Sequence, residues 1–134
     1  MGLVRVRVLL ERGRCYNSAG ERERARPLFQ EAFTLGRELG PHADYHTIDA
    51  AHMLGIVAQS LDTQQRWNET GITLAEASES PRAQSWLGPL YNNSGWNYAD
   101  AEMLDEALAV FLRGWAWRQT HSQDAPHTIR IAKW

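Results

Sequence analysis

Three of the five histidines, His42, His46 and His52, come closest in type and spacing to a metal site. His42 and His46 are four residues apart, but they fall in a connector that leads into a helix, and His52 follows about a turn and a half later. A zinc site needs three or four convergent ligands. No acidic residue or cysteine joins these histidines at a motif spacing, so we expect neither a metal nor a cofactor.

Other patterns of catalytic residues are also missing from the sequence. There is no Gly-rich phosphate loop, and no recognisable Ser/His/Asp or Cys/His order, although triads can be scattered along a chain. The lone cysteine, Cys15, excludes an internal disulfide and is typical of a reducing cytoplasm. In a helix it is expected to be a small buried filler. We therefore expect a protein that is not an enzyme.

The composition indicates one ordinary folded domain. The chain has 134 residues, of which 43% are hydrophobic, and a net charge of -2. Nucleic-acid and membrane-surface binding both need a basic face, which this charge does not supply. No apolar run approaches the ~20 residues of a membrane span, and no secretory signal is visible. Thirteen arginines against one lysine suggest a GC-rich bacterial coding sequence. We expect a cytoplasmic protein.

Helical patterns recur along the chain, and the alternating "VRVRV" near the start is the only strand-like piece. Proline inside the second helix predicts a late start or a bend at Pro27. Asp44 is a candidate cap of the third helix, and Ser80-Pro81 predicts a cap and a first helical residue. The expected helices cover 3–20, 21–39, 45–61 and 64–78, followed by two more that end near Thr120. Six helices in pairs predict an all-α fold of helical hairpins.

One pattern of small and large residues fits all three hairpins. A small residue is followed 12 positions later by another and 16 positions later by a large apolar one. These repeat anchors are Gly13, Ala25 and Phe29, then Ala58, Thr70 and Leu74, then Gly95, Ala107 and Phe111. The middle set is degenerate, and an alternative register on Gly55 fits worse downstream.

The pattern resembles the tetratricopeptide repeat. "YNNSGWNYADAEMLDEALAVF" is the closest match and "LLERGRCYNSAGERERARPLF" a good second. The repeats are expected at about 6–39, 51–84 and 88–121, with 122–134 beginning a fourth first helix that is cut short. Spacings of 45 and 37 residues between the small anchors exceed the standard 34. The repeats are thus similar to the long variety of kinesin light chains and of bacterial regulators. The resemblance implies a right-handed α-solenoid.

The repeat gives Gly95 a structural role. Two helices approach closely only where one carries no side chain at their crossing. Gly95 and Ala107 would form this crossing, with Phe111 filling the space beside it. We expect that Gly95→Leu overpacks the hairpin and costs about 1–3 kcal/mol.

The resemblance also implies which residues face a concave groove lined by the first helix of each hairpin. They are Arg7, Arg14, Asn17, His52, Gln59, Asn92, Asn93, Trp96 and Asp100. The asparagines would hold a peptide backbone through donors and acceptors, Trp96 would stack on a side chain, and the arginines would attract carboxylates. In the alternative interpretation, the asparagines bridge to a neighbouring repeat and Trp96 is buried between repeats.

Two binding functions follow from the resemblance. The first is a scaffold that binds a protein or peptide, as part of a larger bacterial regulatory protein. The alternative is a structural module that pairs with itself into a homodimer through its terminal helices, with no separate ligand. A third class, an enzyme with a small-molecule pocket, is the least favoured.

Overall fold

The computed structural model describes residues 1–121, and every regular element in that range is helical. The long helices are α1 (Gly2–Ser18), α2 (Arg22–Leu39), α3 (Asp44–Val57), α4 (Leu61–Ala77), α6 (Leu87–Asp100) and α7 (Leu104–His121). Two short elements, the 3-10 turn η1 (Pro41–Ala43) and the helix α5 (Pro81–Gln84), lie between hairpins. The all-α class is confirmed. The expected helix start at 122–134 lies outside the described residues.

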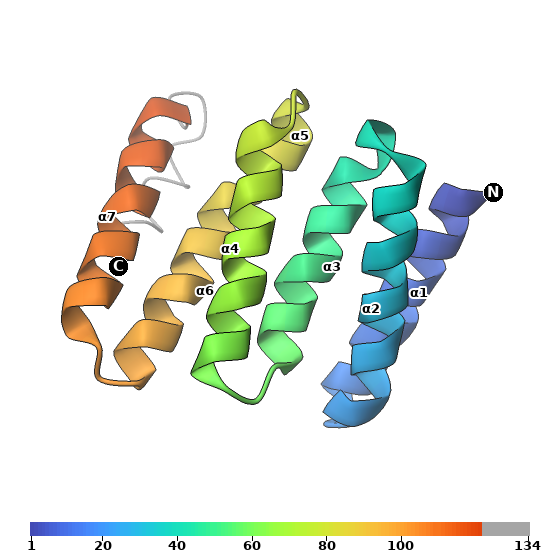
Figure 1. Cartoon of the computed structure of the whole chain (residues 1–134), viewed down its shortest axis with the longest axis horizontal. Coiled ribbons are helices and arrows are strands. Elements are labelled where there is room, and N and C mark those ends of the chain that lie inside the picture. Colours follow the sequence, from blue (N-terminus) through green and yellow to red (C-terminus); the bar gives the residue numbers. More distant parts are fainter. Residues whose placement is uncertain (122–134) are drawn as a thin grey trace.

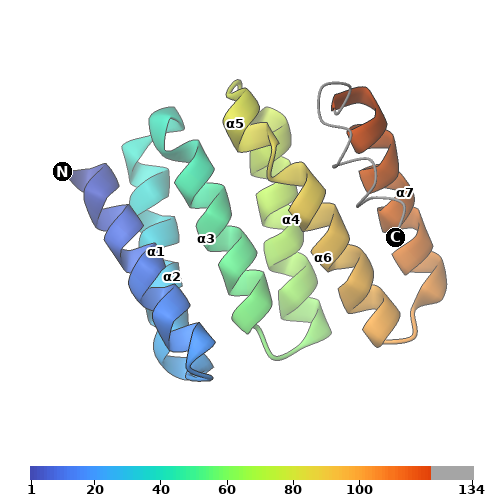
Figure 2. The ribbon, with the colours of Figure 1, turned by 180° about the vertical axis from the view of Figure 1, so that it is seen from behind.

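The helices form three hairpins that stand side by side (Figure 1). The hairpins are α1/α2, α3/α4 and α6/α7, and each second helix also packs against the first helix of the next hairpin. The first helices α1, α3 and α6, together with α5, come to the front in the reverse view (Figure 2). We call the surface formed by these four helices the A-helix face. It carries most of the residues that the sequence predicted for the groove.

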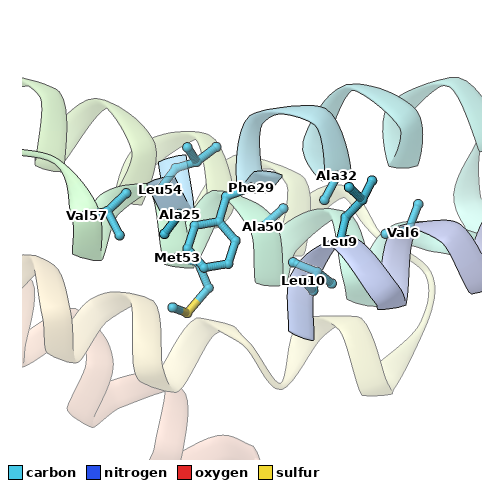
Figure 3. Close-up of a cluster of buried hydrophobic side chains, with 10 residues drawn as sticks. All are labelled: Val6, Leu9, Leu10, Ala25, Phe29, Ala32, Ala50, Met53, Leu54 and Val57. Atoms are coloured by element: carbon cyan, nitrogen blue, oxygen red, sulfur yellow. The ribbon is translucent and has the colours of Figure 1, made fainter. Parts of the chain in front are cut away.

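The first hydrophobic cluster lies between α1, α2 and α3. Phe29 is fully buried, and Figure 3 shows it between Leu10 of α1 and Met53 of α3. Burial of a phenylalanine of this kind contributes about 1.5–3 kcal/mol to folding. The cluster thus joins the first hairpin to the second.

A second cluster joins the middle hairpin to the last one. Ile48 of α3 and Ile72 of α4 pack there with Leu90 and Tyr91 of α6 and Val110 of α7. Ala83 of α5 and Leu87 complete the buried set. Helix α3 therefore contributes to both clusters and is the central element of the fold.

The outer hairpins have the same helix crossing. A Cβ atom on Gly13 would lie 2.4 Å from Cε1 of Phe29, and one on Gly95 would lie 2.4 Å from Cε1 of Phe111. The small residues that precede each phenylalanine, Ala25 and Ala107, are also buried. These six residues occupy the positions that the repeat pattern gives them, because each glycine leaves room for a ring.

The middle hairpin does not use its predicted anchors. Helix α3 ends at Val57, and Ala58 adopts an extended conformation beyond the helix. Thr70 and Leu74 are half-buried and line a shallow groove with Phe33 of α2, away from Ala58. The predicted register is therefore wrong for this hairpin.

Gly55 marks the close approach of α3 and α4 instead. A Cβ atom there would meet Oδ1 of Asn68 at 3.0 Å. The alternative register on Gly55 therefore identifies this crossing, although the residues after Gly55 fit the repeat pattern less well. In that register the small and the large apolar places fall on Trp67 and Gly71, whereas the side chain at the crossing is that of Asn68.

Three local predictions have different outcomes. The Ser80 side chain accepts a hydrogen bond from the Ala83 amide at 3.3 Å, which confirms the predicted cap. The helix that begins at Pro81 is only four residues long, and the chain starts again as α6. Helix α2 runs from Arg22 through Pro27, so no late start occurs. Asp44 does not cap α3, because η1 leads straight into that helix and its carboxylate accepts from Ser78 Oγ at 2.8 Å.

Candidate functional site

A pocket of about 200 Å³ opens on the A-helix face. Residues of α1, of the first half of α3 and of α5 surround it, and three of them are arginines. We call it the arginine pocket; its lining is Arg7, Leu10, Glu11, Arg14, Tyr45, His46, Asp49 and Arg82. Helix α3 presents His46 and Asp49 on one side because they are three residues apart on a helix.

Arg14 is fully engaged by acidic groups of its own chain. Its guanidinium donates to Asp49 Oδ2 across to α3 and to Glu11 Oε1 at 2.8 Å within α1. Burial raises the pKa of Asp49, which is only 4% exposed, and the hydrogen bond from Arg14 opposes that rise. The other oxygen of Asp49 is buried without a hydrogen-bond partner. The expected attraction of Arg14 for carboxylates is therefore met within the molecule.

The other two arginines of the pocket have no carboxylate partner within residues 1–121. The guanidinium of Arg82 lies over the ring of Tyr45, 3.9 Å from its centroid. Burial lowers the pKa of His46, and the positive charges of Arg7 and Arg82 lower it further, while Asp49 has the opposite effect. Three guanidinium groups thus stand against two carboxylates around this pocket.

Aromatic side chains extend from the pocket toward α6. Tyr45 contacts Trp86 with ring centroids 5.5 Å apart, and Trp86 contacts His52 at 5.0 Å. The amide of Asn93 donates to Nε2 of His52 at 2.9 Å. This bond places the ring proton of neutral His52 on Nδ1, which is buried without a partner. Burial, assisted by the charge of Arg14, lowers the pKa of His52 to about 4.

Helix α6 presents the remaining polar and aromatic groups of the face. Asn92 and Asp100 are exposed. Trp96 is 52% exposed and packs edge-on against Phe111, with ring centroids 5.6 Å apart. The alternative interpretation, in which Trp96 is buried between repeats, is therefore wrong. For Asn93 the same interpretation agrees with the structure, since Asn93 bridges to His52 of the middle hairpin.

Two predicted groove residues lie at the turn ends of the hairpins. Gln59 stands in the turn after α3 and donates to Glu23 Oε1 of α2 at 2.8 Å. It leaves the A-helix face because α3 ends earlier than the predicted register required. Asn17 is half-buried in the last turn of α1, where its carbonyl accepts from the Gly20 amide at 3.0 Å. Cys15, which was expected inside, is exposed.

Sequence reasoning missed several residues of this face, namely Tyr45, His46, Asp49, Arg82 and Trp86. A signal for two of them was present. Tyr45 and Asp49 recur at helical spacing with the predicted His52 in "DYHTIDAAH". Arg82 and Trp86 carried no such signal, since the break between α5 and α6 has neither glycine nor proline at it.

Residues 1–121 contain neither a cluster of metal ligands nor a membrane-spanning helix. No group of three or more His, Cys, Asp or Glu side chains is placed to hold a metal ion there. None of the helices in this range combines the length and the apolar character that crossing a membrane requires.

Comparisons with known proteins gave no relatives. No protein-family model matches the chain, and no curated protein and no solved structure matches it either.

Proposed function

We propose that the A-helix face binds an extended segment of a protein partner, and that the chain acts as a scaffold and not as an enzyme. The observation that carries this proposal is the continuous band of polar and aromatic groups across successive helices. It starts at Arg7 on α1, passes through the arginine pocket, and continues through the contacts of Trp86, His52 and Asn93 to α6. Asn92 and Trp96 flank Asn93 on α6.

The chemistry of the band suits recognition of a main chain. The amide of Asn92 offers both donors and an acceptor, which an extended peptide can use whatever its side chains are. The indole of Trp96 provides an exposed aromatic surface for one side chain. Two of the groups that could move protons are engaged, Asp49 by Arg14 and His52 by Asn93. Binding is therefore favoured over catalysis.

The resemblance to long tetratricopeptide repeats supports the same function. In that family the hairpins form a right-handed superhelix with the first helices on its concave side. We propose the same shape here, with the A-helix face as the groove. A cytoplasmic scaffold within a larger bacterial regulatory protein is the context that the resemblance implies.

Selection from a random peptide library on the immobilised protein tests this function. Selected peptides are expected to bind at least tenfold more weakly to the double variant Asn92→Ala/Trp96→Ala, which loses a charge-free hydrogen-bonding group and an aromatic contact. The double variant Gln30→Ala/Thr34→Ala on exposed positions of α2 is the control and should bind as the wild type does. Peptides that bind all three proteins equally, or a library that yields no binder, would contradict the proposal.

Self-association is a second candidate, favoured by an apolar stripe on α7. Leu104, Leu108 and Leu112 recur every fourth residue and are 67%, 58% and 56% exposed. Helix α1 at the other end exposes Val4 and Val8. Light scattering over a range of concentrations tests whether these terminal helices form a homodimer. A Leu108→Lys variant should stay monomeric if they do, and a wild type that is monomeric throughout would remove this candidate.

A further inference from the structure

Four arginines of α1 and α2 form ion pairs with acidic residues, and Arg7 is not one of them. Arg14, Arg24 and Arg26 each pair with a glutamate three residues earlier, and Arg5 pairs with Glu31 of α2. The acid that is four residues from Arg7 is Glu11, and Arg14 binds it. Arg7 therefore lines the arginine pocket without an ion pair to any carboxylate of residues 1–121.

Arg82 reaches the same pocket from a different element. It belongs to α5, the four-residue helix that separates the middle hairpin from the last one. Its guanidinium stacks on the Tyr45 ring, which restricts the side chain before any ligand arrives. Two unpaired guanidiniums thus meet at one pocket from α1 and α5, and their charges are felt together at His46.

We propose that the arginine pocket binds a carboxylate group of the partner segment between the guanidinium groups of Arg7 and Arg82. The ligand class, a protein segment, rests on the proposed function, whereas the preference for an anion rests on the pocket alone. Guanidinium groups match the two oxygens of a carboxylate with paired hydrogen bonds. A glutamate side chain of the partner is the simplest source.

The charge balance favours a carboxylate over a phosphate. Three guanidiniums face two carboxylates, Glu11 and Asp49, so the pocket carries one net positive charge when both acids are ionised. A singly charged carboxylate neutralises this charge, whereas a doubly charged phosphate would leave an excess beside Asp49. The volume of the pocket holds several water molecules, each of which takes about 30 Å³ in the liquid, and therefore accommodates a carboxylate.

The pH titration of His46, followed by NMR, reports on this pocket directly. The probes are N-acetylglutamate amide, its neutral analogue N-acetylglutamine amide, and inorganic phosphate. An anion beside Arg7 and Arg82 offsets their charges, so the glutamate probe should raise the pKa of His46 and the glutamine probe should leave it unchanged. A dissociation constant for each probe follows from the shifts at increasing concentration.

Matched variants separate this site from general surface charge. Arg7→Gln and Arg82→Gln should each weaken the glutamate probe about tenfold or more, since each removes a hydrogen-bonding partner of an ion. Arg12→Gln is the control, because Arg12 is exposed on α1 outside the arginine pocket and should leave the affinity unchanged. Unchanged amide spectra would show that each variant is folded.

Several results would overturn the inference. They are a His46 signal that does not respond to the glutamate probe, an equal response in the Arg12→Gln and Arg7→Gln proteins, and tighter binding of phosphate. None of these measurements uses a peptide, so they are independent of the library selection. Carboxylate binding without any selected peptide would refute the scaffold function alone, and selected peptides that ignore Arg7 and Arg82 would refute the pocket alone.

Discussion

The outer hairpins and the middle hairpin solve the same packing problem with different residues. Gly13 and Gly95 are each the sixth residue from the end of their helix, and Phe29 and Phe111 are each the eighth residue of the next. In the middle hairpin the same two places hold His52 and Asn68. The helix approach itself uses Gly55, one turn after His52, and Asn68 packs there in place of a ring.

The middle hairpin buries polar groups at positions where the outer hairpins bury apolar ones. Phe29 stabilises the first hairpin through burial alone, whereas Asn68 is 1% exposed with no hydrogen-bond partner for its amide nitrogen or oxygen. Buried polar groups without partners cost about 1–3 kcal/mol each. The middle hairpin also buries Gln65, which exchanges hydrogen bonds with Ser94 at 3.0 and 2.6 Å. The hairpin with the least apolar crossing supplies His46, Asp49 and His52 to the A-helix face.

The largest expected effect tests the crossing of the outer hairpins. Gly13→Ala and Gly95→Ala each place a Cβ within 2.4 Å of a phenylalanine ring carbon and should lower the free energy of unfolding by about 1–3 kcal/mol. Leucine at Gly95 should cost at least as much. In the middle hairpin Gly55→Ala is the matched control, since its Cβ would lie 3.0 Å from Asn68 Oδ1 and a gain in helix propensity of about 1 kcal/mol offsets the contact. Urea denaturation measures the free energy of unfolding of each variant. Equal losses for the three alanine variants would contradict the difference between the hairpins.

The same contrast explains what could be predicted from the sequence. Gly13 and Phe29 predict a close helix approach, because glycine weakens a helix and is expected there only where a side chain would not fit. The last hairpin repeats this pair with Gly95 and Phe111. His52 and Asn68 do not fit the pattern, so the predicted repeat register falls on Ala58. That register wrongly places Gln59 on the A-helix face. Arg82 was not placed, because its position depends on where α5 ends, after Gln84.

The next effect in size concerns the polar side of the comparison. Asn68→Leu replaces a buried amide without partners by an apolar group of similar size, so the free energy of unfolding should rise by about 1 kcal/mol. Gln30→Leu on the exposed surface of α2 is the control and should change little. Thermal unfolding of both variants measures the effect. A less stable Asn68→Leu protein would show that the amide has a stabilising partner, such as a bound water molecule.

The stability of the protein should depend on pH through His52, which occupies the helix position that Gly13 and Gly95 have in the outer hairpins. The pKa of His52 is about 4 in the folded protein and about 6.5 when the chain is unfolded. The unfolded state therefore binds the proton more readily, and stability should fall as the pH is lowered from about 6.5 toward 4, by about 1 kcal/mol after allowance for solvent screening.

The difference between two stability curves isolates this contribution. His52→Gln keeps an amide beside Asn93 and should flatten the loss between pH 6.5 and 4, whereas His42→Gln in the exposed η1 turn should not. His46, whose pKa is also lowered, and Asp49, whose pKa is raised, act in both proteins and cancel in the comparison. Parallel curves for the wild type and His52→Gln would contradict the assignment.

The smallest effect tests the turns, where the outer hairpins again agree. Gly20 and Glu102 hold the same place after their helices with φ of 80° and 61°, and the residue after each donates to the carbonyl five residues earlier. A residue with a side chain costs about 1 kcal/mol in this left-handed conformation, part of which glycine returns through its freedom in the unfolded chain. Glu102→Gly should therefore stabilise the protein by about 0.5 kcal/mol, and Gly20→Ala should destabilise it by about the same amount. In the middle hairpin Gln59→Gly should not stabilise, because no residue of that turn has a positive φ. If Gln59→Gly stabilised the protein as much as Glu102→Gly, backbone strain would not distinguish the turns.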